Sequence, residues 1–138
     1  MSKTIKLPSG EFVQTYELIL PDGHFTWLEV TKDGTRIPET IEIEKSIYEA
    51  AKMMEWVRYE LGSYPLHVTS WYRPPNVNRS VGGVSNSRHL FGDGVDFFCN
   101  HLTPNSIYNR LKNKWKSGGL HAYKTFVHID KRGHKARW

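Results

Sequence analysis

The chain has 138 residues, a formal net charge of +5 and an apolar content of 38%. This length and composition are typical of one compact globular domain that buries its own hydrophobic core. Its single cysteine, Cys99, excludes an intrachain disulfide and a zinc site made of clustered thiolates. No stretch is apolar enough to span a membrane, and the opening residues lack the pattern of a secretory signal. We therefore expect a protein that is made in the cytoplasm without a signal peptide.

The first 40 residues are rich in turn signals. Prolines and glycines separate short segments, of which Phe12 to Leu20 alternates loosely and predicts a strand. Thr26 and Glu29 have the spacing of a capping box, which predicts the start of a short helix. We expect residues 1–138 to form a single domain, with residues 1–40 packed on it as an extension.

Two helices follow from the pattern of apolar residues. Between Glu42 and Leu61 these residues recur at helical spacing, and Gly62 is a typical stop after a helix. Thr103 and Pro104 are a typical N-cap and first helical residue, and Gly118–Gly119 is expected to end this second helix. Runs of β-branched and aromatic residues predict three strands, at residues 66–72, 95–99 and 126–130.

A long irregular segment separates the first two of these strands. Residues 76–86 contain Gly82 and Gly83 and lead directly to Ser87 and His89. Long loops in compact domains are usually functional, so we expect this one to border the site. The order helix, strand, loop, strand, helix and strand predicts an α+β fold with a small sheet.

Two histidines and one aspartate are the candidate metal ligands. His89 precedes a glycine turn, Asp96 lies on the strand that follows it, and His128 lies on the third predicted strand. If those two strands are neighbours, the three side chains can converge on one point. Two imidazoles and a carboxylate suit a catalytic Zn²⁺ that keeps one coordination position for water.

The sequence around these residues resembles a known family. Residues 87–96 match the pattern S-x-H-x-x-G-x-A-x-D of zinc D-alanyl-D-alanine carboxypeptidases, with Gly94 in place of the alanine. The resemblance implies the fold that this family shares with the hedgehog signalling domain, with a small, mostly antiparallel sheet and flanking helices. It covers about the last half of the chain and is greatest for the small single-domain members of bacteria and phages. The other matching segments are residues 70–75, 78–86, 118–119, 126–133 and 136–138.

The resemblance implies a role for five residues. His89, Asp96 and His128 would hold the zinc ion. Ser87 would fix one ligand by a hydrogen bond, and Arg73 would orient the substrate. Arginine suits this task because its planar guanidinium group can make two parallel hydrogen bonds to a carboxylate.

One position departs from the family in a way that affects the chemistry. Better-known relatives carry a glutamate or aspartate three residues before the last ligand, where this chain has Thr125. A proton acceptor is still needed for hydrolysis, and Asp130 and His121 are the two candidates for it. Asp130 also has an alternative role, which is to hold a ligand histidine or to pair with Arg132.

These observations predict a monomeric zinc-dependent metallopeptidase that hydrolyses peptidoglycan stem peptides or cross-links, as a carboxypeptidase or endopeptidase. It would act on the cell wall, for instance during phage lysis or from a virion. The alternative is a non-catalytic, zinc-containing module of the same fold that binds the cell wall or a protein. A third alternative, nucleic-acid binding, depends on the basic residues 131–137 alone, whereas the peptidase interpretation involves no nucleic acid.

Overall fold

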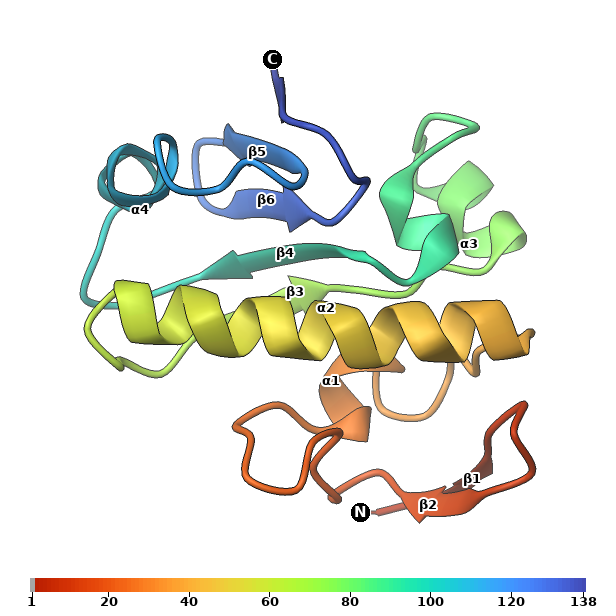
Figure 1. Cartoon of the computed structure of the whole chain (residues 1–138). Helices are drawn as coiled ribbons and strands as arrows, with labels where there is room; N and C mark the ends of the chain where they lie inside the picture. Colours follow the sequence, from red (N-terminus) through yellow and green to blue (C-terminus); the bar gives the residue numbers. More distant parts are fainter. Residues whose placement is uncertain (1) are drawn as a thin grey trace.

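The computed structural model describes residues 2–138 as an α+β structure built around a five-stranded sheet (Figure 1). Its strand order is β3-β4-β6-β5-β7, and all neighbouring pairs are antiparallel except β5 with β7. A separate hairpin is formed by β1 and β2. The elements are β1 (Thr4–Lys6), β2 (Phe12–Gln14), α1 (Trp27–Val30), α2 (Ile41–Glu60), β3 (His67–Ser70), α3 (Pro75–Ser80), the 3-10 helix η1 (Arg88–Phe91), β4 (Gly94–Phe98), α4 (Pro104–Leu111), β5 (Gly119–Ala122), β6 (Val127–Asp130) and β7 (Ala136–Arg137).

The long helix α2 lies along one face of the sheet (Figure 1). Its first turn is capped by Thr40, whose hydroxyl accepts a hydrogen bond from the Ile43 N–H group at 3.1 Å. Gly62 follows the helix with a φ of +97°, which glycine adopts at little cost. The predicted helix is thus confirmed, starting and ending one residue earlier than expected. Neither α2 nor any other helix within residues 2–138 is long and apolar enough to cross a bilayer.

The two central strands, β4 and β6, divide their side chains between two environments. Val95 and Phe97 on β4 and Ile129 on β6 are fully buried in the same apolar cluster as the α2 side chains. Because side chains alternate along a strand, Asp96 and His128 point to the opposite face. The face that α2 does not cover therefore carries the polar residues of interest.

The N-terminal segment contacts the rest of the chain through a few apolar side chains. Ile5, Leu7 and Ile19 are almost completely buried and belong to the same core cluster as α2. The capping box of Thr26 and Glu29 is confirmed at the start of α1, because each side chain accepts a hydrogen bond from the other residue's backbone N–H group. This part of the chain supports the core and lies away from the polar face of the sheet.

Two predicted segments differ from the structure. The strand expected at residues 12–20 ends at Gln14, because the chain turns there and Leu18 forms only an isolated bridge. The loop expected at residues 76–86 begins with the short helix α3, for which Pro75 provides a preset first-turn conformation. Only the part of this segment after α3 remains irregular.

Gly118 and Gly119 also have a different role from the predicted one. Helix α4 ends well before them, and Gly119 begins strand β5. A Cβ atom on Gly118 would lie 1.7 Å from the carbonyl oxygen of Asp130, and one on Gly119 would lie 2.5 Å from its Oδ2 atom. The two glycines are therefore needed because β5 passes directly against Asp130 of β6.

We predict that Gly118→Ala destabilises the protein by about 3 kcal/mol or more, because backbone atoms must move to accept the new methyl group. Thermal and denaturant unfolding would measure the loss. Gly10→Ala is the matched control, because this glycine has a φ of +96° but open space around its Cβ position. Its cost should be backbone strain alone, about 1 kcal/mol. Equal losses in the two variants would contradict the proposed contact.

Candidate metal centre

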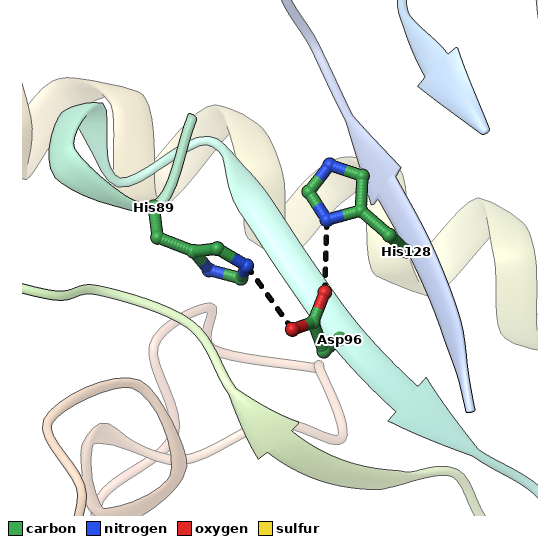
Figure 2. A group of neighbouring side chains, drawn as sticks. All are labelled: His89, Asp96 and His128. Atoms are coloured by element: carbon green, nitrogen blue, oxygen red, sulfur yellow. Dashed lines mark hydrogen bonds and ion pairs between the residues drawn. The ribbon is translucent and has the colours of Figure 1, made fainter. Parts of the chain in front are cut away.

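His89, Asp96 and His128 meet on the polar face of the sheet (Figure 2). His89 comes from η1, and the other two are direct neighbours across β4 and β6. One ligand atom from each residue lies within 4.8 Å of those from the other two. All three side chains are buried, with at most 7% of each residue exposed. The structure thus brings together the three residues that the sequence singles out.

The contacts of the two histidines show that this centre fits a metal ion. His89 has its Nδ1 atom 2.6 Å from the Trp71 carbonyl oxygen and its Nε2 atom 3.1 Å from Asp96. His128 has its Nδ1 atom 2.8 Å from Asp96 and its Nε2 atom 2.8 Å from Asp130. Each ring therefore faces an oxygen acceptor at both nitrogens, whereas a neutral imidazole carries only one N–H group. Either each ring carries a second proton or a cation lies between the rings and Asp96, and a metal ion held by His89 Nε2, His128 Nδ1 and the carboxylate fits the second arrangement.

Burial and pairing act in opposite directions on the charges of this centre. Burial alone would raise the pKa of Asp96, but hydrogen bonds from His128 and His89 hold that pKa well below its ordinary value. Burial would lower the pKa of His128, whereas its hydrogen bonds to Asp130 and Asp96 raise it above the ordinary 6.5. At neutral pH the Asp96 carboxylate is therefore ionised and ready to bind a cation.

Asp130 lies behind His128 and is fully buried. Its carboxylate accepts hydrogen bonds from Nε and Nη2 of Arg132, at 2.9 and 2.7 Å, and from the Gly119 N–H group at 2.9 Å. Burial would raise the pKa of Asp130, but Arg132, His128 and Gly119 hold it far below its ordinary value. This is the geometry of the alternative role considered above, in which Asp130 holds a ligand histidine and pairs with Arg132.

A cavity of about 490 Å³ opens over the three candidate ligands. Arg73 lines it, donating its Nε–H group to the Ser70 hydroxyl at 3.2 Å, with its Nη2 atom 3.6 Å from Asp96 Oδ2. Ser87 lines it too, and its hydroxyl accepts a hydrogen bond from the His89 backbone N–H group at 3.2 Å. Ser87 therefore fixes the backbone of a ligand, while the Trp71 carbonyl orients the ring. Among the cavity-lining residues in the described part of the chain, Asp96 is the only carboxylate.

His121 lies beside His128 on the neighbouring strand β5, but it is not part of the cavity wall. Its ring stacks on that of Trp138, with centroids 5.2 Å apart and planes 2° from parallel. Its Nδ1 atom contacts the carbonyl oxygen of the same tryptophan. Thr125, at the position of the family's acidic residue, is exposed before β6 and is also outside the cavity wall.

Three aromatic side chains in the cavity wall are not singled out by the sequence. The rings of Tyr123 and Phe126 stack with their centroids 4.6 Å apart, and the Trp138 centroid lies 5.6 Å from that of His128. The Arg132 guanidinium group lies 5.3 Å from the Trp138 centroid. Residues 136–138 match the family, but the match assigns no role to Trp138, which reaches the cavity through the pairing of β7 with β5. We refer to Tyr123, Phe126 and Trp138 as the aromatic wall.

The basic residues 131–137 are largely engaged within the molecule. Lys131 lies 3.0 Å from the Glu49 carboxylate, and Arg132 is paired with Asp130. Arg137 donates hydrogen bonds to backbone carbonyl groups between α4 and β5. These contacts leave few of the charges free for phosphate groups, which weakens the nucleic-acid alternative.

Comparison with known proteins agrees with this geometry. The family model described as Peptidase M15 matches residues 23–130, which include all three candidate ligands. The chain therefore belongs to the peptidase M15 family. The zinc D-Ala-D-Ala carboxypeptidase of Streptomyces albus G is 37% identical to it over 43 residues. That match covers 31% of this chain and 17% of the relative, so it extends over only a small part of the relative's length.

The resemblance inferred from the motif is thus confirmed at the level of the family. Zinc, the cofactor predicted from the sequence, is also the metal in the name of this relative. The group formed by two imidazoles and one carboxylate is a ligand set that zinc commonly has in catalytic sites.

We predict that the affinity of the protein for zinc rises with pH between 6 and 8. The metal ion must displace a proton from His128, whose pKa is raised above 6.5, whereas Asp96 is already ionised. Competition with a chromogenic chelator should show a rise of up to about tenfold per pH unit until that pKa is passed. His67 is an exposed histidine at the start of β3. The variant His67→Asn should therefore keep the same pH dependence. A flat profile would contradict this protonation state of His128.

Proposed function

We propose that this protein is a zinc-dependent peptidase that hydrolyses peptidoglycan stem peptides or cross-links. The observation that carries the proposal is the convergence of two buried imidazoles and the Asp96 carboxylate, with an oxygen acceptor behind each ring, at the floor of an open cavity. Membership of the peptidase M15 family supports the reaction class, and the name of the Streptomyces relative supports D-alanyl peptides as substrates. A positively charged protein also suits an anionic cell wall.

Separate residues of the chain would bind the metal ion, bind the substrate and hold the ligands in place. His89, Asp96 and His128 would hold the zinc ion, which when bound supplies a Lewis acid for the scissile carbonyl group. Arg73 would bind the terminal carboxylate of the peptide, because it is the cavity-lining arginine nearest to Asp96, at 3.6 Å. Ser87 would keep the His89 backbone in place through its hydrogen bond.

Asp130 serves, in this proposal, to position His128 rather than to move protons. Its hydrogen bond to Nε2 places the N–H group there and leaves the Nδ1 lone pair for the metal. Four further hydrogen bonds from Arg132 and Gly119 hold the carboxylate, and its complete burial separates it from the cavity. His121 would have a comparable supporting role toward Trp138, on which it stacks.

The wider setting is part of the same proposal. We infer that residues 1–138 act as one domain with the hedgehog/D,D-peptidase type of fold. The α+β architecture and the mostly antiparallel sheet support this fold. The protein would work as a monomer on the cell wall, either as a carboxypeptidase or as an endopeptidase, in a lytic or virion-associated setting.

A second candidate function has one observation in its favour. No carboxylate other than Asp96 lines the cavity in the described part of the chain, and Thr125 replaces the family's acidic residue. A module that binds zinc and wall peptides without cleaving them would have this composition. The two functions therefore share the metal centre and differ in whether a proton can be transferred in the cavity.

We predict that the zinc-loaded protein releases D-alanine or cleaved muropeptides from isolated peptidoglycan. Chelation should abolish this release, and His89→Asn should reduce it at least about hundredfold, because a ligand of the Lewis acid is lost. Mass spectrometry of the products would identify the cleaved bond. His67→Asn is the matched histidine control and should keep full activity. Binding of peptidoglycan with full zinc content but without any product would favour the non-catalytic module.

We predict that Asp130→Asn lowers zinc affinity by about tenfold or more, because His128 loses a charged hydrogen-bond partner. The measurements are zinc affinity, turnover at saturating zinc and thermal stability, made on the same preparation. Near-normal turnover at saturating zinc is the expected result. His121→Asn is the parallel variant for the second candidate proton acceptor. Unchanged zinc affinity with lost turnover, in either variant, would identify that residue as the proton shuttle and contradict the positioning role.

A further inference from the structure

Directly paired residues form a row across the sheet beneath the cavity. Ser70 pairs with Asp96, Asp96 with His128, and His128 with His121. Paired residues on neighbouring strands point to the same face of a sheet, so this row runs perpendicular to the strands on the polar face. Trp138 stacks on His121 and extends the row past β5. The metal centre thus lies in the middle of a line that runs from β3 to β7.

The two ends of this row differ in chemistry. At the β3 end, Arg73 presents a guanidinium group and is held by the Ser70 hydroxyl. At the β5 and β7 end lies the aromatic wall. Arg132, which lies beside this wall, has its guanidinium group bound to the Asp130 carboxylate. One end therefore suits an anion, and the other suits uncharged planar or apolar groups.

We propose that the aromatic wall is the subsite for the residues of the peptide that precede the cleaved bond. This inference rests on the proposed function, in which Arg73 binds the terminal carboxylate and the cleaved bond lies over the metal centre. A peptide placed in this way must continue along the row toward β7, because Arg73 marks the opposite end. The substrate is then a peptide of at least three residues, and a free dipeptide lacks the part that contacts the wall.

The aromatic wall has surface available for such contacts. Trp138 is 54% exposed and Tyr123 is 41% exposed, although the Trp138 ring lies beside the buried His128. Peptide planes and aliphatic side chains gain contact energy on aromatic surfaces of this kind. The Trp138 ring is also held by His121 and Arg132. A ring that is already fixed loses little conformational entropy when a ligand binds.

The test compares two ligands, of which only the longer carries the part expected to reach the wall. They are D-Ala-D-Ala and diacetyl-L-Lys-D-Ala-D-Ala, each with a ketomethylene group in place of the final peptide bond so that neither is cleaved. Dissociation constants would be measured calorimetrically on the zinc-loaded wild type and on Trp138→Ala, Trp138→Phe, Tyr123→Ala and Tyr59→Ala. Tyr59 is the matched control, because it is an exposed aromatic residue on α2 outside the cavity.

The longer ligand should bind the wild type at least about tenfold more tightly than the shorter one. Trp138→Ala should remove most of this difference while changing the affinity for D-Ala-D-Ala by less than about twofold, and Trp138→Phe should restore part of it. Tyr123→Ala should have a smaller effect in the same direction, and Tyr59→Ala none. Equal weakening of both ligands in Trp138→Ala, at unchanged zinc content, would overturn the subsite, as would no weakening of either. Failure of the wild type to bind either ligand would overturn the proposed function and the subsite with it.

Discussion

The arrangement depends on one buried carboxylate that is shared by two imidazole rings. Asp96 sits on β4, between the strand that leads to Arg73 and the strand that carries His128. Burying a carboxylate is costly unless it is paired, and here the two oxygens each face a histidine nitrogen at 3.1 Å or less. Since both histidines also face oxygen acceptors on their other side, the group is satisfied either by a second proton on each ring or by a cation that joins the rings to Asp96.

Two oxygen groups behind the histidines account for residues that lie far from the candidate ligands in the sequence. The Trp71 carbonyl and the Asp130 carboxylate fix which nitrogen of each ring faces Asp96. Asp130 in turn needs β5 to approach closely, and only glycine at positions 118 and 119 allows this approach. Glycine is thus required at the start of β5 because Asp130, which orients the candidate ligand His128 on β6, lies directly against it.

The fold was predictable where the signal is local. The helix over residues 42–61 follows from apolar periodicity, and the capping box at Thr26 follows from a pair of side chains three residues apart. Gly118–Gly119 is predicted to end a helix, because a glycine pair after a helix usually does so. In the structure the two positions need glycine because they contact Asp130 on the distant strand β6. For the candidate site, the motif provided the three possible ligands, Arg73 and Ser87. Trp138 lies in a segment that matches the family, but the match gives it no role, and the parallel pairing of β5 with β7 brings it to the cavity.

The metal centre by itself does not distinguish a peptidase from a binding module, because a cation bound to the buried group is compatible with either function. The distinction depends on what surrounds the cation on its open side. There Arg73 lies at one end and the aromatic wall at the other, with the centre between them. A module that only captured wall peptides would gain most from contacts at the two ends. A line that places an extended peptide directly over a Lewis acid also positions the bond for attack, and this geometry favours the peptidase.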